Sequence, residues 1–213
     1  MVRDAWLPLV CSILACFLVW WGTGHVQWGT ELDSPTRTVN RLIASMSGQP
    51  HLLTSSSAPP PTVAAVTTDE ALALFDLPGI SRKTLGKKWP RLSPTEQDEF
   101  MAIFAQLLIH VAFPQSAAFF RNLETTVTDE RIRGRQATVT TYVEHETEGQ
   151  IDIDYRLIHQ NGDWLIRDIQ LDGVSLSRNL RAQFQQIIRQ DSYEELLRRM
   201  REKLEHAIAP SSS

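Results

Sequence analysis

Cysteine is nearly absent from this sequence. Of its 213 residues only Cys11 and Cys16 are cysteines, and both lie in an apolar run near the N-terminus. The rest of the chain therefore has no thiol for a disulfide framework, a cysteine nucleophile or a cysteine-ligated metal. A surplus of positive charge is also missing, because the formal net charge is -4. A protein that binds nucleic acid by neutralising phosphates needs clustered Lys and Arg, so we expect no nucleic-acid partner.

Motifs for metal binding, catalysis and phosphate binding are missing as well. The six histidines show no metal-ligand spacing, and His145-Glu146 lacks the second histidine, four residues on, of the zincin motif. Residues 173–175 read Gly-Val-Ser, but the second glycine of a nucleophile elbow does not follow, which favours a loop and a helix cap. No glycine-rich phosphate-binding loop is present. We therefore expect no metal, no cofactor and no catalytic residue.

One aspartate leaves an enzymatic alternative open. Asp168 alternates with Trp164 and Ile166, which predicts that its side chain faces inward. Beside Tyr142 or Tyr155, a buried carboxylate could act as a general base with a pKa raised by desolvation. We favour a hydrogen-bonded structural aspartate, with an enzyme that uses Asp168 and Tyr155 as the alternative.

The N-terminus carries an export signal. Residues 5–21 form a 17-residue run that is almost entirely apolar. Arg3 precedes this run, and the next Lys or Arg is Arg37. Because the positive end of such a segment stays inside, everything that follows should cross the membrane.

Three fates of this segment are open. Small residues at the right offset before His25 favour cleavage there, which makes residues 1–24 a signal peptide. An uncleaved run would instead anchor the protein in the inner membrane through residues 5–21. A lipoprotein cleavage site at Cys16 is the least favoured of the three.

The length, and a hydrophobic share of 42%, indicate one globular domain with accessory segments. The first predicted helix spans 33–46, where Ser34 is the cap and Pro35 the first helical residue. The Ser/Pro-rich stretch at about 47–62 predicts a loop or disordered insertion. A capping box at residues 93–96 opens the longest amphipathic pattern, which Pro114 is expected to stop. Short helices are also predicted at 68–74 and from Pro114 to about 123.

Period-two alternation then predicts a sheet. The alternating segments are 136–143, 151–157 and 164–171, and Asn161-Gly162 predicts a tight turn between the last two. With a shorter strand at 124–128, these segments make four antiparallel strands. Two helices follow, at 177–189 and from Ser192 onward. This order indicates an α+β fold with helices stacked on one face of the sheet.

A basic cluster precedes the long helix. Lys83, Lys87 and Lys88 lie close in sequence to Trp89 and Arg91. The cluster is either an exposed turn or a contact for phosphate, for an anionic lipid headgroup or for a docking partner.

From about residue 33 to residue 204 the chain resembles the MlaC family of periplasmic phospholipid-binding proteins, also called the toluene-tolerance auxiliary family. The matching stretches are 74–89, 92–108 and 151–184, and the last of these is the most diagnostic. Its matching motifs are Tyr155-Arg156-Leu157, Gly162-Asp163-Trp164, Asp168, Gly173-Val174-Ser175 and Asn179-Leu180-Arg181-Ala182-Gln183-Phe184.

The resemblance implies a fold and a role. It implies a twisted four-stranded antiparallel sheet wrapped by helices around an apolar cavity, broadly NTF2-like, over residues 25–208, with a disordered tail at 209–213. Family members ferry phospholipid between an outer-membrane lipid complex and an inner-membrane ABC transporter with an MCE-domain subunit, which maintains outer-membrane lipid asymmetry. One branch of the family is associated with hopanoid biosynthesis and with the membrane. The alternative role is therefore an inner-membrane-tethered accessory protein that handles lipid or hopanoid.

A carrier of this kind needs apolar cavity walls. The candidates for lipid binding lie on the long helix, the sheet and the penultimate helix: Phe104, Leu107, Leu108, Val111, Ile151, Ile153, Tyr155, Leu180, Phe184 and Ile187. The candidates for headgroup binding or docking are the basic residues Lys83, Lys87, Lys88 and Arg91.

Overall fold

The computed structural model describes residues 34–47, 68–120, 123–145 and 149–209, all within the compact unit Asp33–Ser213. The predicted signal peptide or anchor at 1–24 lies outside the described residues. Nearly all of the predicted insertion at 47–62 and of the predicted tail at 209–213 also lies outside them.

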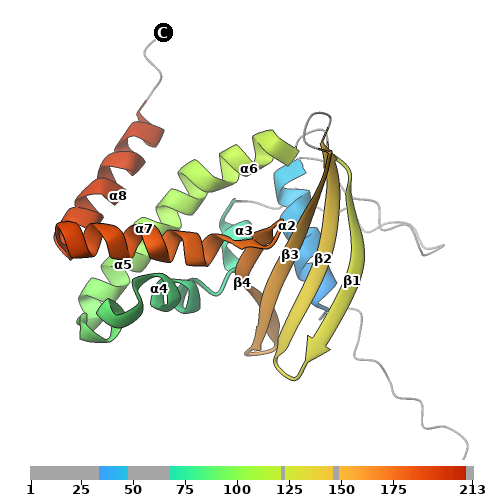
Figure 1. Ribbon diagram of the computed structural model, residues 1–213, viewed down its shortest axis with the longest axis horizontal. Helices are drawn as coiled ribbons and strands as arrows, with labels where there is room; N and C mark the ends of the chain where they lie inside the picture. The colour runs from blue at the N-terminus through green and yellow to red at the C-terminus, as the bar shows by residue number, and fades with distance from the viewer. Residues whose placement is uncertain (1–33, 48–67, 121–122, 146–148, 210–213) are drawn as a thin grey trace, which may run out of the picture. The chain divides into compact units, whose positions relative to one another are not determined.

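The sheet is an antiparallel meander whose five strands lie side by side in chain order (Figure 1). The strands are β1 (Thr125–Arg133), β2 (Gln136–His145), β3 (Gly149–Gln160), β4 (Asp163–Leu171) and β5 (Val174–Ser175). The α+β prediction is confirmed, but four strands were expected and the short β5 makes a fifth. Asn161 and Gly162 have φ angles of 54° and 94°, as the tight turn between β3 and β4 requires.

Along the chain, helices both precede and follow the strands of this sheet. They are α2 (Pro35–Ser47), α3 (Thr68–Ala73), α4 (Leu77–Leu85), the 3-10 helix η1 (Gly86–Arg91), α5 (Pro94–Leu107), the π-helix η2 (Leu108–Ala112), α6 (Phe113–Phe120), α7 (Leu176–Gln190) and α8 (Tyr193–Ile208). α2 packs across the sheet, α4 and α7 contact its strand β4, and α4, α5, α7 and α8 pack on one another beyond β4 (Figure 1).

The capping box of the long helix is confirmed. The Ser93 hydroxyl accepts a hydrogen bond from the Glu96 backbone N–H at 3.3 Å, and the Ser93 N–H donates to a Glu96 carboxylate oxygen at 2.7 Å. Glu96 is negative at the positive end of the helix dipole, which adds to the stability of this terminus.

The expected stop at Pro114 is wrong, because the helix runs on through α6. Proline lacks the N–H of the helical ladder, and its ring clashes with the carbonyl four residues earlier. Just before Pro114 the hydrogen bonds change from the α-helical pattern to the π-helical one, because the N–H of Phe113 bonds to the carbonyl of Leu108, five residues back. The π turn therefore accommodates Pro114 inside a continuous helix from Pro94 to Phe120.

This 27-residue helix is the one candidate for a membrane span among the described residues, because an 18-residue window within it has a mean hydropathy of 1.5. The core helices of soluble proteins meet the same criterion of length and composition. The side chains of α5 that are buried, Phe100 and Phe104, pack against α7.

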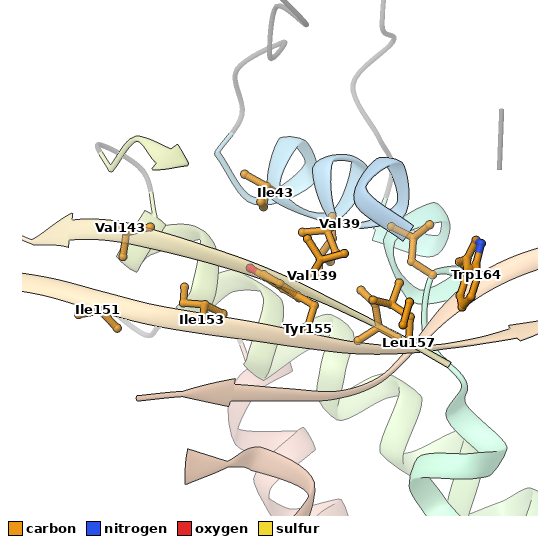
Figure 2. Packing of buried hydrophobic residues seen from close by; sticks show 13 residues of the cluster. Val39, Ile43, Val139, Val143, Ile151, Ile153, Tyr155, Leu157 and Trp164 are labelled. Atoms are coloured by element: carbon orange, nitrogen blue, oxygen red, sulfur yellow. The ribbon is translucent and has the colours of Figure 1, made fainter. Parts of the chain in front are cut away.

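Buried apolar side chains form two clusters. The sheet cluster lies between α2 and the strands, where Val39 and Ile43 of α2 lie above Val139, Ile153 and Tyr155 (Figure 2). The helical cluster joins the helices beyond β4, and its buried members are Ile80, Leu85, Trp89, Leu92, Phe100, Phe104, Phe184, Tyr193, Leu196, Leu197 and Met200.

β1 forms one edge of the sheet. Its pairing with β2 is irregular between Val127 and Asp129, and the residues from Glu130 to Arg133 are exposed. The Asp129 carboxylate forms an ion pair with Arg131 at 2.6 Å.

Candidate functional site

A bulge in β4 determines which side chains face the inside of the sheet. Leu157 of β3 pairs with Ile166, whereas Tyr155 pairs with Ile169, so β4 has one extra residue in this interval. An extra residue reverses the alternation of side chains along a strand. Ile169 therefore lies on the same face as Ile166 and Tyr155.

The bulge also reverses the faces of the residues that follow it. Leu171 pairs with Ile153 and joins it on the inner face. Asp168 pairs with Arg156, whose side chain is exposed on the opposite face. Asp168 is buried, as the alternation with Trp164 and Ile166 predicted, but it lies on the opposite face of the sheet from them because the bulge interrupts their alternation.

The inner face of the sheet bounds an apolar cavity of about 270 Å³. The other walls are α2, α6 and the first residue of α7. The lining residues are Leu42, Met46, Gln115, Ser116, Phe119, Phe120, Ile153, Tyr155, Ile169, Leu171 and Leu176. None of these side chains carries a charge at neutral pH, so the cavity suits an uncharged apolar guest.

α6 is an apolar helix that the described part of the chain covers only partly. None of its eight residues is buried, although three of them are phenylalanines. Phe119 packs edge-on against Phe120, with ring centroids 5.0 Å apart, and stacks on His145 at 5.4 Å. Protein interiors are normally filled to the density of organic crystals. An apolar guest in the adjacent cavity would supply the contacts that α6 lacks.

Tyr155 provides the buried polar group of this cavity. Its side chain is 3% exposed, and this burial raises the pKa of the phenol well above its usual range. A hydrogen bond with Thr141 lowers the pKa, but by less than burial raises it. The phenol therefore stays neutral over the physiological pH range. It offers a hydrogen bond but no charge.

Asp168 belongs to a separate polar network on the other face of β4. One of its oxygens accepts from Lys83 Nζ at 2.9 Å and from the Ser175 hydroxyl at 2.6 Å, while the other accepts from the Ser177 N–H at 3.1 Å. Burial alone raises the pKa of Asp168, but hydrogen bonds from Ser175, Lys83 and Ser177 outweigh it and lower the pKa overall. A low pKa and a position away from Tyr155 suit a structural aspartate, not a general base.

The predicted wall residues separate into two groups. Ile153 and Tyr155 line the cavity, and Ile151 lies in the sheet cluster. The remaining residues are on the long helix and α7. Phe104 and Phe184 are buried in the helical cluster, and Val111 is half-buried in η2. The residues that pack against the helical cluster are Leu107, Leu108, Leu180 and Ile187. Contact of any of these residues with lipid stays a prediction.

Sequence reasoning missed most of the cavity lining. The helical period placed Leu42 and Met46 on one face of α2, but it could not show that this face borders a cavity. The signal for α6 was the density of apolar residues in 113–120 without a matching polar face. Ile169 and Leu171 were not among the predicted lining residues, because the alternation of residue types along a strand does not reveal a bulge.

The basic cluster is partly used by the fold. Lys83 is bonded to Asp168, and Lys88 Nζ lies 5.0 Å from the ring centroid of Tyr193 in α8. Lys87 and Arg91 are exposed. A role of these four residues in headgroup binding or docking stays a prediction.

Within the part of the chain that the structure describes, no group of three His, Cys, Asp or Glu side chains could hold a metal ion. The cavity is lined mainly by hydrocarbon side chains, and its polar lining groups are the Tyr155 phenol, the Ser116 hydroxyl and the Gln115 amide.

Comparisons with known proteins agree with this geometry. A family model described as MlaC protein matches residues 37–202. A solved structure with a similar fold is that of the phospholipid-binding protein from Ralstonia solanacearum in complex with a phospholipid. The TM-score is 0.61 at 18% sequence identity, over 82% of this chain and 96% of that chain. A search of curated proteins finds no match.

Proposed function

Because the chain belongs to the MlaC family, we propose that it binds the hydrocarbon chains of a phospholipid in its cavity and carries the lipid through the periplasm. The observation that carries this proposal is the apolar cavity between the sheet, α2 and α6. The family is periplasmic, and its members are binding proteins, which fits a site without catalytic groups.

The energetics of lipid transfer explain why such a cavity is useful. Exposing one methylene to water costs about 0.8 kcal/mol, so two acyl chains of roughly thirty methylenes would cost more than ~20 kcal/mol. A protein that sheathes the chains removes most of this cost without making or breaking a covalent bond. Its site needs apolar walls and little polar chemistry.

The lining also indicates where the lipid headgroup would lie. A charged phosphate would lose its hydration inside a cavity whose walls carry no charge. We therefore place the headgroup outside, at the solvent-exposed rim formed by Gln115 and Leu176. The exposed cations Lys87 and Arg91 would then act in docking to a membrane or protein partner.

The partners that this role requires are a lipid donor and a lipid acceptor at the two membranes. We propose an inner-membrane ABC transporter with an MCE-domain subunit and an outer-membrane lipid complex, as the family resemblance implies. A carrier that moves between them must lose residues 1–24. An uncleaved anchor at 5–21 would confine the protein to lipid handling at the inner membrane. Sequencing the N-terminus of the protein from the periplasmic fraction separates these two cases.

The binding step can be tested with tryptophan substitutions on α6. Ser116 lines the cavity, whereas Ala118, two residues on, is exposed. We expect that protein from the periplasmic fraction carries phospholipid in native mass spectra and takes it up from vesicles after delipidation. Ser116→Trp fills the cavity and should abolish loading, while the control Ala118→Trp should load normally.

A wild-type protein that is always empty and takes up nothing from vesicles would contradict the proposal. Equal loading of folded Ser116→Trp and Ala118→Trp would show that lipid binds elsewhere. Circular dichroism and thermal melting confirm that each variant is folded.

A further inference from the structure

The cavity is small for the ligand proposed above. A cavity of roughly 150 Å³ holds benzene, so the 270 Å³ cavity has room for a hydrocarbon chain of only about ten carbons. The acyl chains of membrane lipids are longer. Unless more space is joined to the cavity, part of each chain would remain in water at about 0.8 kcal/mol per methylene.

A second cavity of about 180 Å³ lies next to the first. Met46 lines both cavities, and Ala71, Ile109, Phe113 and Ala117 are among the other lining residues of the second. Six of its eight lining side chains are apolar and come from α2, α3 and the long helix, and the other two are the hydroxyl residues Ser45 and Thr68. Two of these side chains are alanines, which leave the space open.

α6 contributes to both cavities with adjacent stripes of its surface. Phe113 and Ala117, four residues apart, face the second cavity. Ser116 and Phe120, also four residues apart, face the first. Residues at this spacing share one helix face, and the two pairs are neighbours around the helix axis. One helix thus forms a common wall, and Met46 stands opposite it in the last turn of α2.

Methionine suits the position of a movable divider. Its unbranched side chain has three rotatable bonds and a thioether that tolerates several apolar surroundings at little cost. Met46 is half-buried, so its side chain is less tightly held than the fully buried Leu42 one turn earlier on α2.

We propose that Met46 is a movable partition between the two cavities, and that its rotation extends the site so that it accepts hydrocarbon chains longer than the first cavity alone can hold. This proposal rests on the proposed function and adds a determinant of chain length to it. Short chains occupy the first cavity with Met46 in place. Longer chains displace Met46 and continue along α6 toward Ala117.

The test compares two single-chain probes, decanoate and palmitate, on delipidated protein from the periplasmic fraction by titration calorimetry. Wild-type protein should bind both, and palmitate more tightly. Ala117→Trp fills only the second cavity, so the affinity for palmitate should fall by more than roughly tenfold while that for decanoate stays within about twofold. Ala118→Trp, on the exposed side of α6, should match the wild type. Met46→Ala removes the partition and should raise the preference for palmitate over decanoate.

The outcomes separate the two proposals. Wild-type protein that binds neither probe would overturn the partition, and it would contradict the proposed function as well only if the same protein also takes up no phospholipid from vesicles. If the wild type binds both probes and Ala117→Trp leaves the palmitate affinity unchanged, the partition is disproved while the first cavity remains a binding site. Ala117→Trp keeps this test decisive even if Met46→Ala does not fold.

Discussion

At the scale of single residues, Asp168 shows how one carboxylate ties three elements together. From β4 it binds Lys83 of α4, the Ser175 cap of α7 and the backbone N–H of Ser177 in the first turn of α7. A negative charge at this helix terminus also interacts favourably with the helix dipole. The family motifs that contain Asp168 and Gly173-Val174-Ser175 are thus explained by packing of α4 and α7 on the sheet.

This network makes stability depend on pH in a defined direction. The folded-state pKa of Asp168 lies below its unfolded value of about 3.9, so its ionisation stabilises the fold above that pH, and the contribution is lost as pH falls through the folded pKa. We expect Asp168→Asn to lower the free energy of unfolding at neutral pH by about 3 kcal/mol. This value is at the low end of the range for breaking a buried ion pair, because Lys83 is partly exposed to solvent.

Urea denaturation over a pH series measures both effects. In Asp168→Asn the decline of stability below about pH 4 should be shallower than in the wild type. Asp163→Asn, an exposed position at the start of the same strand, is the control and should change neither quantity. An acid dependence of Asp168→Asn equal to that of the wild type would rule out the proposed role of Asp168.

At the scale of elements, α7 is a packing helix of the second cluster. The ring of Phe184 lies edge-on to Phe100 and Phe104 of α5, with centroids 6.0 and 6.5 Å apart. Phe184→Ala should therefore cost about 3–5 kcal/mol of stability and leave lipid loading of the folded protein intact. Thermal melting and native mass spectrometry measure the two effects, with the exposed neighbour Gln186→Ala as control. Loss of loading in folded Phe184→Ala would instead support the sequence-based assignment of Phe184 to the lipid-binding wall.

The elements also show what periodicity can and cannot predict. Caps and apolar stripes depend on residues close in sequence, so α2, the Ser93 capping box and the strands were predictable. The apolar face of α5 was predicted correctly, but the element that packs on it was not. The spacing of apolar residues does not show whether Phe104 packs on α7 or on a ligand. Pro114 and the bulge before Asp168 were misjudged, since both depend on backbone irregularities that residue types do not reveal.

At the scale of the whole molecule, the cavity exists only when α2, α6 and the sheet are assembled. A ligand that binds only the folded state stabilises it by about 2.7 kcal/mol at a hundred times its dissociation constant. For a domain of this size we expect the melting temperature to rise by roughly 5–10 °C on loading with lipid. Differential scanning calorimetry of loaded and delipidated protein measures the shift. Ser116→Trp should show none, and identical melting of the two wild-type forms would argue against a ligand in this cavity.

The edge strand β1 has a consequence for a protein that leaves apolar side chains such as Ile132 and Leu176 exposed. Open strand edges invite pairing with a second molecule, and such pairing begins aggregation. Here the outer end of β1 carries Glu130, Arg131 and Arg133, and its register is broken after Val127. Charges and an irregular backbone both oppose edge-to-edge joining. These two features of β1 therefore oppose self-association of the protein through its open sheet edge.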